Sequence, residues 1–582
     1  MALLCLYYVA THGVFQGKFS GDGLFGFEYL RAIVYKHTID MQAVMPEWRP
    51  YFGVDPITQH MPNRCPIGPV FAWMPFYLLA CGLQRLGELT HLLHHHLRPN
   101  SVFHGWMAGL GTLVFVLIGY RHTYRLLARR VGRTAAQLGC TVAVWATPIV
   151  WYAVTQPMYQ HGCAFGLVAL LLDYWDETLG DARLRRFAWM GFIGGLAMTM
   201  RAQEVLFLLL PGGEILYRLA RGPRVNADRK AWFLGGLVLC AVTLVAFSPQ
   251  LFAWHYYTGS FRPVQVEPLR WGTPMFLVAL FSTRSGLFPW SPIAYAALIG
   301  LFVARRARVL LIALTCVMAV EVYICACAWV PSGAYSYGAR RLSDAAPLLG
   351  LCIALLYDRV QASPWRRRLT LGFSCFCVAL TLFTMEMQRT HNVPSSGGYA
   401  RPASRYLIQV NAPVWMQNLF EKIGYPFVQP AGWIFALWHH VPVYSFEGVV
   451  GNFQLDRDGQ WFTVLPEGRS LQLVWAARAN IANGLSLDHA DKAPAVVTGP
   501  VRLLLSMFAS EQIAIRIPGE VSAGPISAAW NGAPVTAARV ADGIQLDVPA
   551  TQVKVGVNEL TLDVPLGSRL KSLDFTSVTR WW

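Results

Sequence analysis

Long apolar runs recur from residue 2 to residue 387 of this chain, and this is the feature that most restricts its fold. Hydrophobic residues make up 54% of the sequence and charged residues only 14%, against about a quarter in a soluble domain. We therefore predict a mainly α-helical bundle that lies in a membrane. The runs lie at roughly 2–15, 66–84, 102–120, 134–154, 162–178, 187–200, 203–217, 232–254, 273–282, 288–304, 308–329, 343–358 and 369–387.

Basic clusters between the runs predict how the chain crosses the membrane. The formal net charge is +16, but the basic residues are placed as in short cytoplasmic loops, so we expect no nucleic-acid partner. Two crossings fit between successive clusters if 273–282 stays on the outer side. Before Arg121, the runs 2–15 and 102–120 cross the membrane, and 66–84 forms an interfacial helix in the first outer loop. This predicts about eleven spans, with the N-terminus inside and the C-terminus outside. The clusters are Arg121–Arg133, Arg183–Arg186, Arg218–Lys230, Arg305–Arg308 and Arg359–Arg368.

The first apolar run, 2–15, is too short for an ordinary membrane span, since it is only about 21 Å long as a helix. The hydrocarbon core of a bilayer is about 30 Å thick. Either the first helix is short or the chain starts upstream. It has no basic segment before it and no small-residue cleavage site, so we expect no signal peptide here.

The pattern changes to short alternating strands near Val443. Residues 470–475, 513–517, 544–548 and 559–564 alternate apolar and polar side chains and are separated by Gly, Pro and Asn. This period of two predicts a C-terminal antiparallel β-sandwich or jelly-roll-like domain. We therefore divide the chain into a transmembrane domain at 1–390, a connecting segment at 391–442 and a β domain at 443–582.

Asp22 is the first candidate for chemistry on the outer side. It stands between two glycines, which leave space near the carboxylate for a substrate. A carboxylate in a partly apolar cleft can act as a general base toward a sugar hydroxyl. The alternative is a structural role, in which Asp22 caps the helix that starts near Leu24. Glu28 and Asp40 can line the same cleft, although Glu28 is also spaced to pair with Arg31.

Four arginines break the positive-inside pattern, because their segments face outward in this topology. A planar guanidinium matches phosphate, and several near the membrane surface can hold a lipid phosphate. The alternative is that they pair with carboxylates such as Asp22, Glu204, Glu267 or Asp344. The arginines are Arg201, Arg284, Arg340 and Arg341.

The outer segments also supply neutral polar candidates. We expect His60 and His161 to be exposed on the outer side, where they can bind a divalent metal together with Asp22. No ligand spacing marks such a site, so no cofactor is assigned. The remaining candidates for the cleft are Asn63, Gln203, Tyr335 and Tyr337.

Several segments resemble the C-type glycosyltransferases, which use polyprenyl-phosphate sugars. Gly21-Asp-Gly and the aromatic-rich helix after it look like the first outer loop of that family, and the order of the segments is similar over about 440 residues. The most similar branch is the bacterial one described as dolichyl-phosphate-mannose-protein-mannosyltransferase-like. The other similar segments are Asn63-Arg-Cys-Pro-Ile-Gly-Pro, Gln156-Pro-Met-Tyr-Gln-His, Arg201-Ala-Gln, Arg284-Ser-Gly-Leu-Phe, Tyr335-Ser-Tyr-Gly-Ala-Arg-Arg and Pro430-Ala-Gly-Trp-Ile-Phe-Ala-Leu.

This resemblance implies an enzyme, a hexosyl- or pentosyltransferase of the bacterial inner membrane. It would move a sugar from a polyprenyl-phosphate donor to a glycan, lipid or protein acceptor on the periplasmic face, where the C-terminal domain would also lie. The catalytic or metal-associated carboxylate of the family matches Asp22, and the contact to the lipid phosphate matches Arg340 or Arg341. Many relatives have Asp-Glu where this chain has Asp22-Gly23, so a second carboxylate is left open.

Two other functions fit a chain of this kind. A transporter or flippase for lipid-linked sugars also needs many helices and buried arginines, with polar groups near the midplane. A non-catalytic scaffold would use the β domain to bind a glycan, and Asp22 would then only begin a helix.

Overall fold

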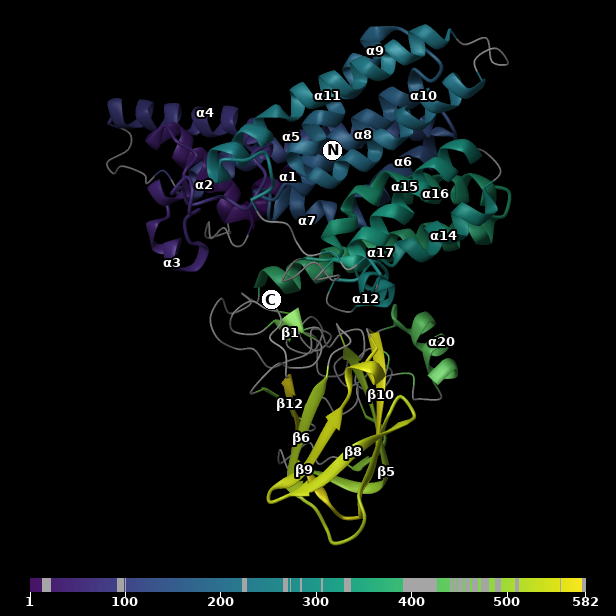
Figure 1. Cartoon of the computed structure of the whole chain (residues 1–582). Coiled ribbons are helices and arrows are strands. Elements are labelled where there is room, and N and C mark those ends of the chain that lie inside the picture. The colour runs from purple at the N-terminus through teal and green to yellow at the C-terminus, as the bar shows by residue number, and fades with distance from the viewer. Residues whose placement is uncertain are drawn as a thin grey trace. The chain divides into compact units, whose positions relative to one another are not determined.

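The computed structural model in Figure 1 forms two compact units. The helical unit comprises 1–268, 291–323 and 339–385, and the second unit comprises 269–290, 324–338 and 386–582. The structure describes residues 1–12, 22–91, 99, 101–221, 228–264, 269, 271–272, 274–282, 285–304, 307–328, 337–390, 426–439, 443, 446, 454–455, 461–462, 469–472, 481–486, 494–507, 512–554 and 556–577.

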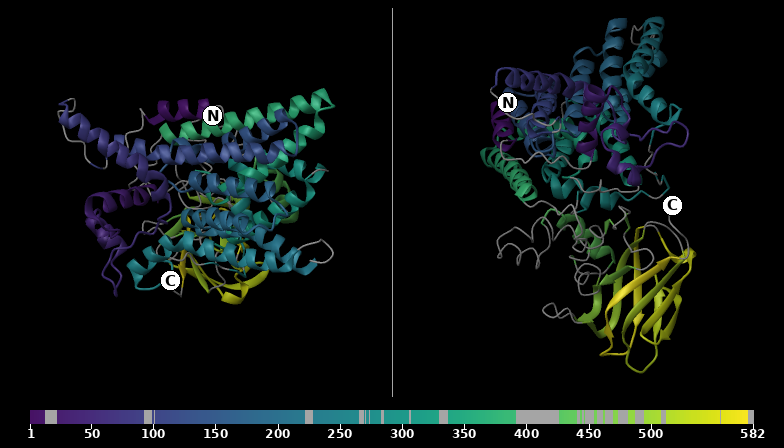
Figure 2. Two further views of the ribbon diagram at one scale, coloured as in Figure 1. Left: turned by 90° about the horizontal axis from the view of Figure 1, so that it is seen from above. Right: turned by 90° about the vertical axis from the view of Figure 1, so that its left-hand side faces the viewer.

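Helices coincide with the apolar runs of the sequence, so the predicted mainly helical fold is confirmed (Figures 1 and 2). The helices of this unit are α1 (Ala2–His12), α2 (Asp22–Lys36), α3 (Arg49–Phe52), α4 (Pro69–Leu89), α5 (Val102–Ala128), α6 (Arg133–Trp145), α7 (Ile149–Val154), α8 (His161–Glu177), α9 (Leu184–Met200), α10 (Leu209–Arg221), α11 (Arg229–Thr258), α14 (Ile293–Val303), α15 (Arg308–Cys327), α16 (Ala346–Val360) and α17 (Pro364–Thr390). The last residues of α15 and α17 belong to the second unit.

Four of the described helices are long and apolar enough to cross a membrane, namely α5, α11, α15 and α17. Other predicted spans form helices that are shorter or interrupted. The run at 134–154, for example, forms α6 and α7 with a break between them. The prediction of about eleven crossings therefore stays a prediction. The predicted interfacial helix corresponds to α4, which buries Trp73 and Tyr77 and exposes Phe71 and Leu78.

The helices approach one another closely where small residues face each other. A Cβ added to Gly300 of α14 would lie 2.1 Å from the carbonyl oxygen of Cys352 in α16. Such a contact leaves no room for a side chain, so the glycine lets the two backbones touch. Small residues thus set the spacing of the helices around α16, which directly follows the segment Arg340–Ala345 in the chain.

Two short 3-10 helices interrupt the bundle and bring polar groups to helix ends. Arg201 follows α9 in an extended conformation, and η3 (Ala202–Leu208) leads from it into α10. In the same way η5 (Arg340–Ala345) leads into α16. Two further 3-10 helices, η1 (Met41–Ala43) and η2 (Pro46–Trp48), follow α2. Arg201, Gln203, Arg340 and Arg341 lie at these interruptions, whereas Asp22 begins α2 and His161 begins α8.

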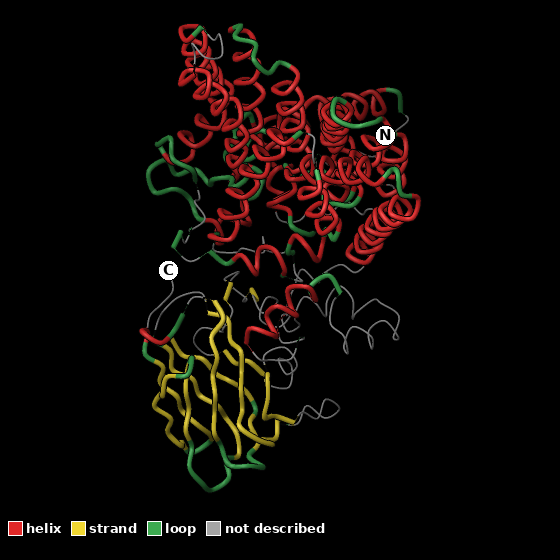
Figure 3. Tube along the Cα trace, turned by 90° about the vertical axis from the view of Figure 1, so that its right-hand side faces the viewer, coloured by secondary structure: helices red, strands yellow, loops and turns green. Residues whose placement is uncertain are grey.

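Among its described residues, the second unit contains three short helices and the β strands (Figure 3). The helices are α12 (Phe276–Phe281), α13 (Leu287–Trp290) and α20 (Gln429–His439). The strands are β1 (Gln454–Leu455), β2 (Trp461–Phe462), β3 (Arg469–Gln472), β4 (Ile481–Ser486), β5 (Ala495–Met507), β6 (Ile513–Glu520), β7 (Ser527–Trp530), β8 (Ala533–Val540), β9 (Gly543–Val548), β10 (Gly556–Asp563), β11 (Arg569–Leu570) and β12 (Ser572–Ser577), with a 3-10 turn, η6, at Ala550–Gln552.

The strands of the larger sheet pair antiparallel along a closed path. Strands β5, β10, β7, β8, β9 and β6 follow one another, and β11 pairs with both β5 and β6. Strands β12 and β3 extend from β6, and β4 pairs with β5. Alternate side chains such as Ile515, Leu546 and Leu560 fill the core. The predicted antiparallel β domain is therefore confirmed in kind, while the sandwich type stays a prediction.

Trp530 is the largest side chain in this core, and its polar atom is satisfied inside. The indole Nε1 of Trp530 donates to Oδ1 of Asn558 at 3.0 Å, and Asn531 donates to the same oxygen at 2.8 Å. Asn558, in the Gly-x-Asn segment that begins β10, is only 1% exposed. This asparagine therefore holds the core together and does not face a ligand.

Candidate active site at the start of α2

Asp22 and Arg340 form the centre of the candidate site. Nη1 of Arg340 donates to Oδ2 of Asp22 at 2.7 Å, although the two residues are 318 positions apart in the sequence. Asp22 lies in the first turn of α2, where the helix dipole favours a negative charge. The side chain of Asp22 is 40% exposed and that of Arg340 is 16% exposed. Asp22 is therefore accessible to a solute while it pairs with the arginine.

Tyr159 forms an aromatic wall beside this pair. The guanidinium carbon of Arg340 lies 5.9 Å from the centre of the Tyr159 ring, within the range of a cation–π contact. The ring fits there because residue 23 is glycine: a Cβ at Gly23 would lie 3.0 Å from Tyr159 Cε2. The glycine after Asp22 thus makes space for an aromatic ring.

The segment from Asn63 to Cys65 fixes the start of α2 from another side. Asn63 donates to the carbonyl oxygen of Phe25 at 2.8 Å and accepts from the backbone N–H of Cys65 at 2.9 Å. The thiol of Cys65 donates to the carbonyl oxygen of Asp22 at 3.3 Å. Asn63 is therefore a positioning residue, and its 2% exposure leaves it little contact with a ligand.

Electrostatics reinforce the pairing of Asp22 with Arg340. Burial lowers the pKa of the Arg340 guanidinium, but the Asp22 carboxylate opposes this strongly, and the resulting pKa lies above the ordinary value. Burial, followed by the charge of Asp22, raises the pKa of the Cys65 thiol well above its usual range. Arg340 is thus a permanent cation, and Cys65 stays a neutral hydrogen-bond donor.

A buried layer behind the pair holds η5 in place. Arg201 donates to the carbonyl oxygen of Arg341 at 3.2 Å, and Gln203 donates to the same oxygen at 3.0 Å. Ser343 Oγ donates to the carbonyl oxygen of Arg340 at 2.7 Å. These contacts fix the backbone on both sides of the peptide that links Arg340 to Arg341.

Carboxylates surround the guanidinium of Arg201. It pairs with Asp344 and lies 3.3 Å from Oε1 of Glu204, and it is only 7% exposed. Gln203 also donates to Glu321 of α15 at 2.6 Å. Arg201 was predicted to hold the lipid phosphate, but its donors are taken up by carboxylates and a carbonyl, as the ion-pair alternative expects. Its contacts with Asp344 and with the carbonyl oxygen of Arg341 help to hold η5, and its role toward a lipid phosphate stays a prediction.

The two histidines do not share one site. His161 was predicted to be exposed, and this is wrong: it is 2% exposed at the start of α8, because Tyr152 and Ser343 pack around it. His60 stacks on Tyr256 and pairs with Asp40 at 3.0 Å. Among the described residues no group of three His, Cys, Asp or Glu side chains is placed to hold a metal ion.

The other predicted cleft residues also have local partners. Asp40 caps η1 by accepting from Gln42 N–H, besides its contact with His60. Glu28 pairs with Arg31 as its spacing predicts; burial raises the pKa of Glu28, and Arg31 opposes this.

In the second unit, Tyr337 is 2% exposed and packs edge-on against Trp290. Arg284 and Tyr335 lie outside the described residues.

Sequence reasoning missed two residues of this region. Tyr159 lies within a segment that was singled out, but a lone tyrosine beside apolar residues gave no reason to select it. Glu321 had a usable signal, because it is a carboxylate inside the apolar run 308–329, where ionisable groups are costly.

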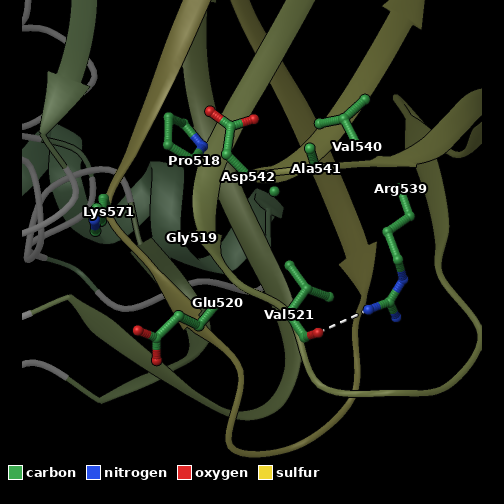
Figure 4. A pocket seen from close by; sticks show the side chains of 10 residues that line it. Pro518, Gly519, Glu520, Val521, Arg539, Val540, Ala541, Asp542 and Lys571 are labelled. Atoms are coloured by element: carbon green, nitrogen blue, oxygen red, sulfur yellow. Dashed lines mark hydrogen bonds between the residues drawn. The ribbon is translucent and has the colours of Figure 1, made fainter.

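The β domain has a cavity of about 440 Å³ at one end of strands β6, β8 and β9 (Figure 4). Arg539 points toward the loop after β6 and donates to the carbonyl oxygen of Val521 at 2.7 Å. Glu520, Asp542 and Lys571 also line the cavity and provide charged groups there. That this domain binds a glycan stays a prediction.

No family model and no curated protein matches this chain. Among solved structures it is similar to ArnT from Cupriavidus metallidurans bound to undecaprenyl phosphate, at 16% identity and a TM-score of 0.41, over 75% of this chain and 73% of that chain. The apo state of the same protein gives 15% identity and a TM-score of 0.41, over 76% of this chain and 71% of that chain. The arabinosyltransferase EmbB from Mycobacterium smegmatis gives 11% identity and a TM-score of 0.34, over 99% of this chain and 65% of that chain. The chain is thus similar, at low identity, to solved structures that include an arabinosyltransferase and a protein bound to undecaprenyl phosphate.

Proposed function

We propose that this chain is a membrane glycosyltransferase of the C-type family. It transfers a sugar from a polyprenyl-phosphate donor to an acceptor hydroxyl on the periplasmic face of a bacterial inner membrane. The observation that carries the proposal is the contact between Asp22 and Arg340. It joins a candidate general base from the first outer segment to a candidate phosphate ligand from a late one, as the sequence resemblance implies.

Asp22 acts as the general base in this proposal. Its carboxylate oxygen Oδ1 accepts the proton of the acceptor hydroxyl while the hydroxyl oxygen attacks the anomeric carbon of the donor. The bond from that carbon to the phosphate oxygen breaks at the same time, and polyprenyl phosphate leaves as an anion. Attack from the face opposite the phosphate inverts the anomeric centre. Glu28 and Asp40 have partners of their own, so the proposal assigns one carboxylate to this step.

Arg340 stabilises the leaving phosphate. A guanidinium offers paired N–H donors to phosphate oxygens, and its effect grows as negative charge develops on the leaving group. Since Nη1 of Arg340 already donates to Asp22, the incoming phosphate competes with that carboxylate for the same cation. Donor binding would then release Asp22 to face the acceptor. Binding of the donor and activation of the base are coupled in this way.

A second candidate function rests on one observation. Glu321 is 2% exposed in α15, one of the helices long and apolar enough to cross a membrane. Ionisable groups inside spanning helices often mark a transport pathway. A transporter for lipid-linked sugars would use the Glu321–Gln203 region and would not need Asp22 as a base.

One assay separates these functions. The purified full chain in liposomes is given a panel of polyprenyl-phosphate sugars with candidate acceptors, and release of polyprenyl phosphate is measured together with movement of the sugar lipid between leaflets. Release supports the enzyme, movement without release supports the transporter, and binding alone supports a scaffold.

A matched pair of variants tests the site itself. Arg340→Gln should lower turnover by about 10²–10³-fold, the usual effect of losing a donor that stabilises a developing anion. Arg366→Gln is the control, because Arg366 lies over Trp365 at the start of α17 and belongs to a predicted cytoplasmic cluster. Equal turnover of Arg340→Gln and the wild type would remove Arg340 from the mechanism.

A further inference from the structure

Helix α20 presents an exposed apolar face that the proposed reaction does not use. Trp433, Ile434, Leu437 and Trp438 are exposed by 61%, 66%, 75% and 79%. Their spacing of one, four and five residues places them on one side of the helix. Gln429–His439 contains no Asp, Glu, Lys or Arg. This is a concentrated apolar surface with two indole rings.

The opposite side of α20 is apolar as well and is packed. Val428 and Phe435 are 1% and 6% exposed, and Phe435 lies 5.2 Å from the ring of Phe446. A Cβ added to Gly432 would lie 3.3 Å from Val443, so the helix rests closely on the segment after it. Because its inner face is fixed, the orientation of its outer face is fixed too. A helix that is apolar all round belongs in a protein core or in contact with lipid.

Aromatic contacts continue from α20 to elements next to a membrane helix in the chain. Phe446 also lies 6.2 Å from Phe281 of α12, and Phe281 stacks on Phe288 of α13 at 4.9 Å. The apolar helix α14 begins at Ile293, three residues after α13 ends. Helix α12 exposes Phe276 and Leu277 by 41% and 42%. The apolar surface of α20 is therefore tied to a segment that leads directly into the bundle.

The dimensions of α20 suit the membrane interface and not the membrane interior. Eleven residues make a helix about 16 Å long, roughly half the 30 Å of a hydrocarbon core. An interfacial helix lies in the plane of the membrane surface, with its apolar face buried in the boundary between headgroups and acyl chains. Tryptophan is enriched at that depth, where its ring meets lipid and its N–H meets water.

We propose that α20 is an interfacial membrane anchor, with Trp433, Ile434, Leu437 and Trp438 inserted among lipid headgroups and upper acyl chains. In the topology expected above, this is the outer leaflet. Paired tryptophans can also stack on a glycan, but Ile434 and Leu437 between them offer no hydrogen bond to sugar hydroxyls. The face therefore fits lipid better than a carbohydrate. The anchor would attach the second unit to the bilayer.

The test measures the surroundings of this face in the full chain. The starting variant has the exposed cysteines Cys240, Cys316 and Cys375 replaced by alanine. Leu437→Cys is added to it, the new thiol is labelled with an environment-sensitive fluorophore, and the protein is placed in lipid nanodiscs. The matched control is Leu566→Cys, because Leu566 is an exposed leucine of the β domain, at 69%. Ile434→Cys repeats the measurement on the same face in case one label disturbs folding.

We expect a blue-shifted emission at residue 437 that is quenched by lipids with a doxyl group near the headgroup and protected from iodide. At residue 566 we expect emission that is not blue-shifted, no quenching by the doxyl lipids, and quenching by iodide. Iodide quenching at 437 equal to that at 566 would show a face in water and overturn the anchor. A blue shift without lipid quenching would overturn it as well, since it means that protein, from this chain or a second copy, covers the face. Both readouts are independent of sugar transfer.

Discussion

Replacing Asp22 by asparagine should change turnover and donor binding in opposite directions. Asparagine keeps the size of the side chain but cannot accept a proton as a base, so turnover should fall. The same change removes the carboxylate that competes with phosphate for Arg340. Polyprenyl phosphate should therefore bind more tightly to the variant than to the wild type. If Asp22 only began a helix, its replacement would not lower turnover and tighten the binding of polyprenyl phosphate together.

The two effects have different sizes. Loss of a positioned general base costs about 10²–10⁴-fold in rate. The gain in binding is limited by the strength of the ion pair, which is modest because Asp22 is 40% exposed. Ion pairs of this exposure contribute up to about 1 kcal/mol, and that corresponds to roughly fivefold in Kd. Since exposed charges are screened by salt, the gain should shrink at high ionic strength.

The assay combines single-turnover release of polyprenyl phosphate with equilibrium binding of polyprenyl phosphate in nanodiscs at two salt concentrations. Asp55→Asn is the matched control: Asp55 is a carboxylate of the same outer segment that accepts backbone N–H groups within its own turn. If Asp22→Asn binds the lipid phosphate no more tightly than Asp55→Asn, the proposed competition for Arg340 is wrong. If it retains full turnover, Asp22 is not the base.

Three further predictions concern stability. Arg201→Gln leaves Asp344 and Glu204 without their buried cation and should lower the free energy of unfolding by about 3–5 kcal/mol, seen as a lower unfolding temperature in detergent. The control is Arg183→Gln, in an exposed pair with Asp181, which should leave that temperature unchanged. Gly300→Ala should cost about 1–3 kcal/mol, because its Cβ meets the Cys352 carbonyl, whereas Gly213→Ala, which meets nothing within 4 Å, should not destabilise. Asn558→Ala should cost about 1–3 kcal/mol by leaving the Trp530 N–H without its acceptor, and should expose the β domain of the full chain to protease; unchanged cleavage would contradict this.

The helices and strands could be predicted because each rests on a local pattern. A run such as 308–329 is apolar over its whole length, and the structure forms α15 from Arg308 to Cys327 within it. Alternation at 513–517 and 544–548 likewise marks β6 and β9. The break between α6 and α7 leaves no trace in hydrophobicity, but Pro148 marks it, because the residue before a proline is disfavoured in a helix.

The contacts of the site could be predicted only as alternatives. The sequence placed Asp22, Glu204 and Asp344 among the possible partners of the outer arginines, but it did not say which arginine meets which acid. Arg201 takes Asp344 and Glu204, and Arg340 takes Asp22, because η3 and η5 bring them together through tertiary packing. The buried state of His161 was missed for the same reason: Ser343 lies 182 positions away in the sequence, and Tyr152 reaches His161 only because α7 packs against α8.

The separation of Asp22 from Arg340 has a consequence for biosynthesis. A ribosome adds about 5–20 residues per second, so the 318 residues between them take roughly 15–60 s to make. During that interval the carboxylate has left the ribosome and its cation does not yet exist. A nascent chain that stops before η5 therefore carries α2 and most of the bundle but lacks the cation of the proposed site. Any competence to handle a charged lipid would arise late in synthesis, after nearly all of the bundle has been delivered to the membrane.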